Sequence, residues 1–381
     1  MNKPFFSVLI PTKNRAHIVG YAIQSVLNQS FTDFEIIVVD NDDSETTRSA
    51  VQKFSDPRVK YFRTSGLNMC ENWEYALVQA QGEYVTVLED KQAYYRFALE
   101  KISSVISCEG VEVVAWGWDV YMDKIRTAYK TSSGCGVEKM SSDHVLCKYT
   151  TSTQDVWELL PRMLNSCISQ KVINKIKSYP AVDKFFSEVS PDLCAAFYTL
   201  AEVDELCFVK ERLGLVGYLN LSNAEKFRSS KNKEMSYFGK EDFSEMLVDH
   251  VPIKECRLTH NTIYNDFLRI RERMSGRLAK YQMTPYIYAK TCVSDLVQVP
   301  FLIGPAFEEI VSFMKLHKLP MFSLWFFFLI RRIDRWFVNF FAKYDWLQKL
   351  NIRRKREIWE ADNILEATRL MGDMCAVSVK D

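Results

Sequence analysis

The chain has 381 residues, of which 48% are hydrophobic and 25% are charged, a composition typical of folded globular proteins. A chain of this length can form two domains or one elaborated domain with a large core. Its formal net charge of +1 gives no reason to expect a nucleic-acid partner. The ten cysteines lack CxxC pairs and zinc-ligand spacing, and no secretory signal opens the chain. We therefore expect reduced thiols and a cytoplasmic location.

The first hundred residues alternate between apolar runs and helical patterns. Three apolar runs, at 5–10, 34–39 and 84–88, each end in a polar cluster, as buried strands of a parallel sheet do. Helices are expected at 16–29, 44–54 and 72–81, with a further short strand at 59–62. Strands interleaved with helices predict an α/β, doubly wound, mostly parallel sheet with its site at the carboxyl edge.

The middle of the chain is less regular. Strands are expected at 111–116 and 206–209, and helical patterns cover 153–177 and 191–203. A polar, charged stretch at 222–240 predicts a linker or a lid, and the chain then has a helical pattern to its end.

The segment 320–341 combines an apolar run with basic residues. Its unbroken apolar stretch is about ten residues long, too short for the ~20 that a spanning helix needs. Trp325, Leu329 and Trp336 share one face of the expected helix, whereas Arg331 and Arg335 lie on the other. This pattern fits a helix in the membrane interface, but it also fits a core helix packed on the remainder of the protein. The basic run at 353–356 would add attraction to anionic lipids.

Four motifs occur in order in the first hundred residues. They are Ser-Val-Leu-Ile-Pro-Thr-Lys-Asn-Arg at 7–15, Ser-Val-Leu-Asn-Gln at 25–29, Glu-Ile-Ile-Val-Val-Asp at 35–40 and Ala-Gln-Gly-Glu-Tyr-Val at 80–85. Together they resemble the opening of family 2 glycosyltransferases over about residues 5–101. The resemblance implies a GT-A fold and inverting transfer from a nucleotide-sugar donor to a hydroxyl of a glycan or lipid-linked glycan, in surface polysaccharide synthesis.

The resemblance also implies a division of the chain. Residues 1–105 would form the nucleotide-sugar-binding half of the GT-A domain, and 106–225 the acceptor-binding half. Residues 226–381 would form a helical C-terminal region, which on the interfacial interpretation contacts the inner face of the cytoplasmic membrane through 320–341.

The donor-binding residues carried over from the family are Pro11, Thr12, Asn14, Arg15, Asp40, Asn72, Glu89, Asp90 and Lys91. Asp40 would accept from an N–H of the base, which discriminates strongly against a base that lacks this donor. Arg15 would pair with phosphate or lie on the surface. Trp73 is expected to pack under the sheet.

In the family, the strand at 84–88 ends in an Asp-rich DXD motif that holds ribose and a divalent metal. Here it ends in Glu89, Asp90 and Lys91. Three interpretations stay open: a Mg²⁺ or Mn²⁺ site using Glu89 and Asp90, a metal-independent site in which Lys91 neutralises the leaving diphosphate, or a degenerate domain that binds nucleotide sugar or serves in assembly. Asp90 is the candidate metal ligand.

An inverting transferase needs one general base to remove the proton of the acceptor hydroxyl. The family takes it from an acid near a helix start in the second half, for which Asp192, after Pro191, is the first candidate. Glu188 is the substitute and Asp183 the third choice. As the alternative to a catalytic role, Asp192 would stabilise the first turn of its helix.

Two further features bear on the function. Arg212, Ser222 and Asn223 would form a phosphate-gripping loop, or an ordinary linker. A nucleotidyltransferase shares the architecture in outline, but its triphosphate loop needs glycines that 11–15 lacks.

Overall fold

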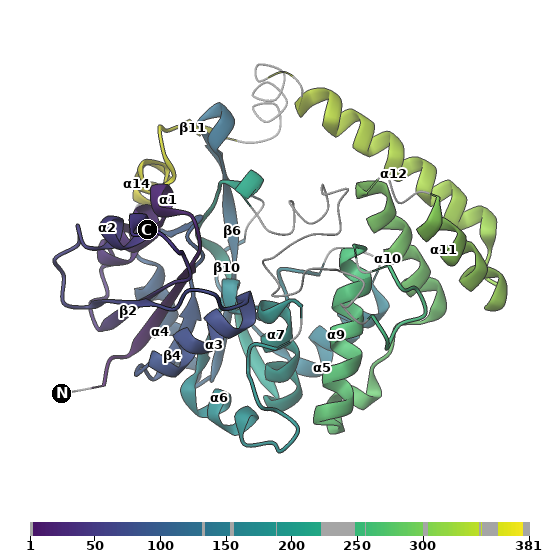
Figure 1. Ribbon diagram of the computed structural model, residues 1–381, viewed down its shortest axis with the longest axis horizontal. Helices are drawn as coiled ribbons and strands as arrows, with labels where there is room; N and C mark the ends of the chain where they lie inside the picture. The colour runs from purple at the N-terminus through teal and green to yellow at the C-terminus, as the bar shows by residue number, and fades with distance from the viewer. Residues whose placement is uncertain are drawn as a thin grey trace.

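The computed structural model describes residues 3–131, 134–152, 156–187, 189–221, 248–255, 257–299, 304–342, 344 and 357–375. The strands of this part of the chain join one 11-stranded mixed sheet. Helices cover both faces of the sheet, and further helices lie beside it (Figure 1). This arrangement confirms the predicted α/β class with C-terminal helices.

The N-terminal half forms the parallel part of the sheet. Its strands are β1 (Phe6–Thr12), β2 (Phe34–Asp40), β3 (Val59–Arg63) and β4 (Tyr84–Val87), paired in the order β3-β2-β1-β4. The helices between them are α1 (Ala16–Leu27), α2 (Thr46–Val51) and α3 (Met69–Gln79). Every residue of β1 and β2 is buried, as expected for parallel strands covered on both faces.

The second half extends the sheet largely by antiparallel pairing. β9 (Ser166–Ser169) lies between β4 and β6 (Val113–Met122), and β7 (Thr127–Tyr129) and β11 (Ile358–Glu360) follow outward. The long strand β10 (Glu205–Val216) runs parallel to β6 and antiparallel to β5 (Gln92–Tyr94) and β8 (Val137–Ser141).

Two hydrophobic clusters occupy the two faces of the sheet, because alternate residues of each strand point to opposite sides. Leu9 and Ile37 belong to one cluster, with α3 and the C-terminal helices. Val8 and Ile36 belong to the other, with α1 and α4 (Ala98–Glu109). The helices α5 (Ser142–Thr151), α6 (Gln170–Lys177) and α7 (Pro191–Glu202) contribute to the first cluster.

Four long helices continue from this cluster: α9 (Thr259–Met274), α10 (Pro285–Gln298), α11 (Pro305–Leu316) and α12 (Met321–Ala342). They stand on the side of the molecule away from α1 and α2, with α12 outermost (Figure 1). None of the helices in the described part of the chain is long and apolar enough to cross a bilayer.

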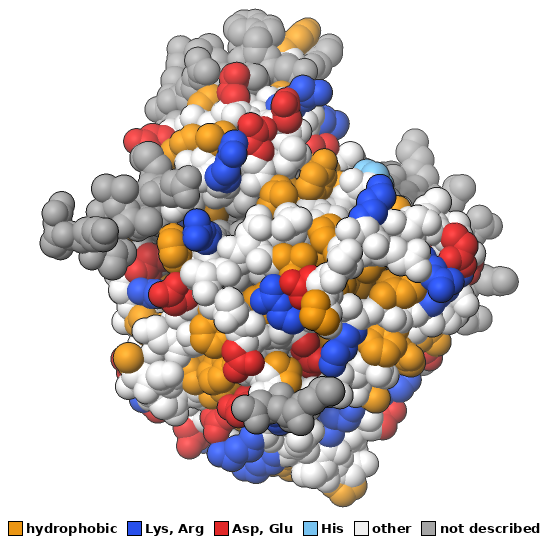
Figure 2. Space-filling model, turned by 90° about the vertical axis from the view of Figure 1, so that its left-hand side faces the viewer, with side chains coloured by type: hydrophobic (Ala, Val, Ile, Leu, Met, Phe, Trp, Pro, Cys, Tyr) orange, Lys and Arg blue, Asp and Glu red, His pale blue; other side chains and the backbone are white. Residues whose placement is uncertain are grey.

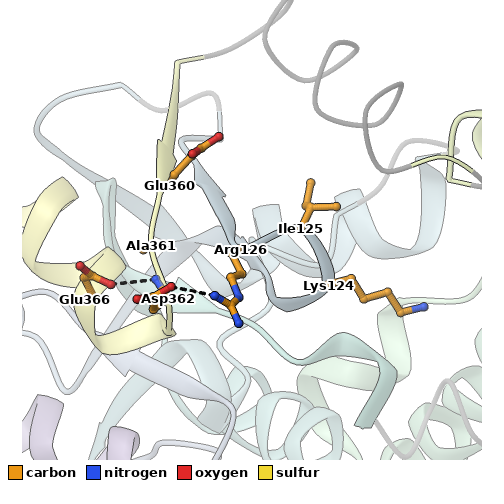
Figure 3. Close-up of a pocket in the computed structure, with 7 residues that line it drawn as sticks. All are labelled: Lys124, Ile125, Arg126, Glu360, Ala361, Asp362 and Glu366. Atoms are coloured by element: carbon orange, nitrogen blue, oxygen red, sulfur yellow. Dashed lines mark hydrogen bonds and ion pairs between the residues drawn. The ribbon is translucent and has the colours of Figure 1, made fainter.

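The C-terminal segment returns to the sheet. β11 pairs with β7, and α14 (Ile364–Cys375) follows it. Figure 3 shows the junction, where Arg126 forms an ion pair with Asp362 at 3.0 Å and the Asp362 amide donates to Glu366 at 2.7 Å. Ile364 and Met371 of α14 are buried in a small core. The prediction of helices to the end of the chain was therefore wrong at β11, and the described residues 357–375 pack on the sheet.

The helical prediction for 153–177 was wrong over much of its length. Within the described residues 156–177, Ser166–Ser169 form β9, a fully buried strand, Met163–Asn165 form a short 3₁₀ helix, and α6 is the one α-helix. The apolar spacing did not distinguish a short buried strand followed at once by a helix. The Ser169 hydroxyl marks the boundary, since it accepts from the amide of Val172 and so caps α6.

Two details of the α3 region also differ from expectation. The helix starts at Met69, three residues early, because Asn68 and Glu71 form a capping box. The helix also ends at Gln79 rather than at 81, and Gly82 beyond it allows a close approach of two backbone segments. A Cβ at Gly82 would lie 2.5 Å from the amide nitrogen of Ser7, so a side chain there would push β1 and β4 apart.

Acidic and basic side chains are interspersed on the face of the molecule that Figure 2 shows. This pattern agrees with the near-zero net charge. It does not form the broad positive surface that nucleic-acid backbones require.

Candidate active site

The predicted site residues lie at the carboxyl ends of β1, β2 and β4. Thr12 and Asp40 face each other in the register of β1 with β2, and 89–91 follow β4 after one residue, Leu88. The amino end of α7 belongs to the same region, since the charge of Glu89 is one cause of the raised pKa of Asp192 in its first turn. Residues from both halves of the chain therefore meet at this edge.

Asp90 forms the centre of a buried hydrogen-bond cluster. Its side chain is 1% exposed, Thr12 Oγ1 donates to its Oδ2 at 2.8 Å, and Arg15 Nη1 donates to its Oδ1 at 2.8 Å. Arg15 also donates to the carbonyl of Leu221, which follows β10. Burial raises the pKa of Asp90, and the Arg15 charge opposes the rise. The cluster ties β1, β4 and the residues after β10 together.

Glu89 and Lys91 form a second pair beside this cluster. Lys91 Nζ lies 3.1 Å from Glu89 Oε2, and both side chains are largely buried. The backbone here is held as well, since the Glu89 amide donates to Gln92 and the Lys91 carbonyl accepts from the Gly217 amide at 2.9 Å each. The two charges are thus paired at the end of β4.

Asp192 lies at the start of α7, after Pro191, and its side chain is 16% exposed. Arg162 Nη1 is 4.0 Å from its Oδ2. Burial raises the pKa of Asp192, the negative charge of Glu89 raises it further, and Arg162 opposes the rise. A carboxylate with a raised pKa binds a proton more readily near neutral pH, as a general base must.

Asp40 is fully buried at the end of β2. Its carboxylate accepts from the Tyr61 hydroxyl at 2.7 Å and from the Asp42 amide at 2.9 Å. Burial raises the pKa of Asp40, and these hydrogen bonds lower it in part. Asn72, also buried, accepts from Thr64 at 2.7 Å and so braces the ends of β2 and β3.

The remaining predicted residues fall into three groups. Pro11 is buried within β1, whereas Asn14 is exposed and has a left-handed φ of 58°. Asp183 is exposed. Glu188 lies outside the described residues, as do Ser222 and Asn223 of the proposed phosphate loop.

Arg212, the other residue of the proposed phosphate loop, is bound to other side chains of the protein. Its Nη1 lies 2.9 Å from Glu158 and its Nε donates to Thr131 at 2.7 Å. Trp73 packs under the sheet as predicted, since it is 5% exposed and meets Phe186 edge to face at 5.3 Å.

Sequence reasoning missed two residues of the site. Arg162 lies 4.0 Å from Asp192, but it belongs to an irregular segment whose position the pattern of apolar residues does not reveal. The Tyr61 hydroxyl, on β3, donates to Asp40. Only the parallel pairing of β2 with β3 could have indicated this contact, since it places Tyr61 opposite Val38, two residues before Asp40.

The residues at this edge do not match a divalent-metal site. Both oxygens of Asp90 are engaged by Thr12 and Arg15, and Glu89 is paired with Lys91. Within the described ranges, no group of three or more His, Cys, Asp and Glu side chains could hold a metal ion. The shallow hollow of Figure 3, lined by residues such as Lys124 and Glu360, shares no residue with the site.

In open α/β sheets, ligands bind at the carboxyl edge of the strands, where this sheet gathers acidic and basic side chains from both halves of the chain. Residues 7–151 match the sequence profile of Glycosyl transferase family 2. The chain therefore contains a glycosyltransferase domain of this family, as its motifs predicted.

Curated relatives align with the same region. A GalNAc(5)-diNAcBac-PP-undecaprenol beta-1,3-glucosyltransferase of Campylobacter jejuni is 36% identical over 155 residues, 39% of this chain and 49% of that protein. The UDP-Glc:alpha-D-GlcNAc-diphosphoundecaprenol beta-1,3-glucosyltransferase WfgD of Escherichia coli is 27% identical over 32% of this chain and 48% of its own length. The chain thus spans about half the length of these relatives.

Among solved structures, S. aureus TarS 1-349 in complex with UDP-GlcNAc is 13% identical. The alignment covers 82% of this chain and 91% of that one, with a TM-score of 0.48.

Proposed function

We propose that this protein is an inverting glycosyltransferase with Asp192 as its general base. One observation carries the proposal: Asp192 lies at the start of α7 with its side chain only 16% exposed and Arg162 Nη1 4.0 Å away, and burial and the charge of Glu89 raise its pKa. This supports a base from the second half beside the donor site that the family resemblance implies at the end of β4.

The donor would be a nucleoside-diphosphate sugar. Asp40 would accept from the base, in exchange for one of its internal hydrogen bonds, while Thr12 and Arg15 frame the nucleoside with Pro11 and Asn14. Lys91 and Arg15 supply positive charge within a few ångströms of the strand end, and charge fixed at a developing anion stabilises the transition state. We therefore favour neutralisation of the diphosphate by Lys91 over a metal held by Asp90.

The chemical step follows from this placement. The acceptor oxygen attacks the anomeric carbon on the face opposite the diphosphate, forming the new glycosidic bond as the bond to the phosphate oxygen breaks. The acceptor proton passes to Asp192, and the electron pair leaves with the nucleoside diphosphate beside Lys91. Attack from the opposite face inverts the anomeric configuration.

The acceptor would be a lipid-linked glycan, used in surface polysaccharide synthesis at the inner face of the cytoplasmic membrane. Two relatives are named for undecaprenol-linked diphosphate acceptors. The helix α12 supports contact with a membrane, because its outer face consists of large exposed apolar residues beside exposed arginines. These residues are Phe322, Trp325, Phe326, Leu329, Ile330, Ile333, Trp336, Phe337 and Phe340.

The inner side of α12 packs on its neighbours, with Leu324 and Phe328 buried. One helix thus combines the two arrangements left open by the sequence. Its inner face belongs to the core, and its outer face fits the boundary between headgroups and acyl chains.

Calorimetric titration with a panel of nucleoside diphosphates, UDP first, each with Mn²⁺ and with EDTA, tests the donor site. We expect one nucleotide to bind, with similar affinity in both buffers, and Lys91→Gln to weaken that binding at least tenfold. Binding that requires Mn²⁺ would contradict the role given to Lys91. Absence of binding by every nucleotide would favour a degenerate domain.

A further inference from the structure

A pocket of about 330 Å³ lies between α5, the segment after it, and the helices α9, α10 and α12. Its lining includes Tyr149, Trp157, His260, Lys290, Phe327 and Arg331. None of these residues belongs to the donor site. The pocket therefore needs its own explanation.

Two basic side chains approach the same aromatic ring at this pocket. Lys290 Nζ lies 4.7 Å and the Arg331 guanidinium carbon 5.6 Å from the centre of the Phe327 ring. Arg331 also donates to Ser294 at 3.2 Å. Within the part of the chain that the structure describes, neither cation has a carboxylate within ion-pair distance. Two positive charges held on one ring repel each other, and an anion bound between them would relieve this repulsion.

Asp295, the acidic residue that lines the pocket, is already bound to His260. Asp295 is 2% exposed, and its carboxylate accepts from the His260 amide at 2.6 Å and contacts the His260 ring. Among the described residues, Asp295 forms no ion pair with Lys290 or Arg331; its partner is His260.

The pocket is also placed between the candidate active site and the apolar face of α12. Phe327 and Arg331 belong to α12. On the other side of the pocket, the Trp157 ring lies 4.8 Å from the His260 ring. Trp157 is five positions along the chain from Arg162, which lies 4.0 Å from Asp192. Five residues span at most ~18 Å. A ligand in the pocket thus lies within the length of a short glycan from the proposed base.

We infer that this pocket binds the diphosphate group of a polyprenyl-diphosphate-linked acceptor. Lys290 and Arg331 bind the phosphate oxygens, and Trp157 provides an aromatic surface for the first sugar. The inference deepens the proposed function and rests on it for the nature of the acceptor. It places the lipid at α12 and the glycan toward Asp192.

Farnesyl diphosphate, a short and water-soluble polyprenyl diphosphate, is the probe for calorimetric titration of the full chain. We expect saturable binding that weakens at least tenfold in the double variant Lys290→Gln, Arg331→Gln. Arg335→Gln is the matched control, since this exposed arginine of the same helix does not line the pocket. It should bind the probe as the wild type does.

Three outcomes would overturn the inference. The first is a double variant that binds farnesyl diphosphate as tightly as the wild type, and the second is a wild type that binds farnesol as tightly as farnesyl diphosphate. The third is a double variant that loses UDP binding as well as farnesyl diphosphate binding, which would make the pocket a nucleotide site. UDP titration of the wild type reports on the donor site separately. Wild type that binds farnesyl diphosphate through Lys290 and Arg331 but no nucleotide would leave the pocket intact and refute the proposed transferase.

Discussion

Replacement of Asp192 by Asn is the most direct test of the proposed mechanism. The amide keeps the size of the side chain but cannot accept the acceptor proton. General bases contribute about 10²–10⁴-fold to rate, so we expect kcat to fall by about that factor, equivalent to about 3–5 kcal/mol of activation free energy. Donor affinity should stay near that of the wild type, because Arg15, Asp40 and Lys91 are untouched.

The structure also predicts the effect on stability, which separates a catalytic role from a structural one. The Arg162–Asp192 pair is long, at 4.0 Å, and partly exposed pairs contribute about 0–1 kcal/mol. Asp192 has a pKa raised above its ordinary value of 3.8, so the unfolded state holds its charge more readily than the folded state does. Below pH 3.8 Asp192 is protonated in both states, and its burial then costs no stability. As pH rises through the raised pKa, the buried carboxylate becomes charged and the protein loses stability. At neutral pH the Asn variant should therefore be no less stable than the wild type.

The assay is transfer of radiolabelled sugar to a lipid-linked acceptor, with thermal unfolding measured on the same samples. Asp183→Asn is the matched control, because Asp183 is exposed and lies in the same region of the chain. It should retain full activity. An Asp192→Asn protein with turnover within twofold of the wild type would refute the role of Asp192 as base. Loss of activity accompanied by a large fall in melting temperature would indicate a structural role.

Two further predictions follow from the same structure. First, kcat/KM of the wild type should fall as pH decreases through the raised pKa of Asp192, because the base must be deprotonated. The pH profile of Asp192→Asn should lack this fall, and a wild-type kcat/KM that does not change with pH would contradict the role of Asp192. Second, the double variant Trp336→Glu, Phe337→Glu should weaken co-sedimentation with anionic vesicles at least tenfold, since burial of each ring contributes about 1.5–3 kcal/mol. Phe97→Glu is the control, because Phe97 is a 40% exposed aromatic residue at the start of α4, which lies apart from α12 (Figure 1). Equal sedimentation of the wild type and both variants would exclude membrane contact through α12.

Point substitutions are preferable to deletion of 320–381 for this test. Such a deletion would also remove β11 and α14, which complete the sheet and bury Ile364 and Met371 against it. The exposed core would make the truncated protein aggregate, and sedimentation would then report on misfolding.

The donor half was predictable because its signals are local. The strands β1, β2 and β4 are continuous apolar runs that end in polar residues, and parallel pairing requires those ends to meet. Thr12, Arg15 and Asp90 accordingly lie together. The strand and helix boundaries differed by only a few residues, as at the capping box of α3.

The second half was less predictable because its contacts are distant in sequence. β9 is four residues long and pairs antiparallel on both sides, so no helix-length pattern or hairpin turn announces it. Arg162 reaches Asp192 across 30 positions, and α14 packs against α1 from the other end of the chain. Such placements depend on packing, which a single sequence does not display.

The proximity of Glu89 to Asp192 links donor binding to the strength of the base. In the free protein, Lys91 compensates part of the Glu89 charge at 3.1 Å, and Glu89 raises the pKa of Asp192. On the proposed mechanism, the diphosphate draws Lys91 toward itself and leaves Glu89 less compensated. Repulsion between Glu89 and Asp192 then increases, which raises the pKa of Asp192 further and makes it a stronger base. The same lysine that neutralises the leaving group would thus strengthen the base once the donor is bound.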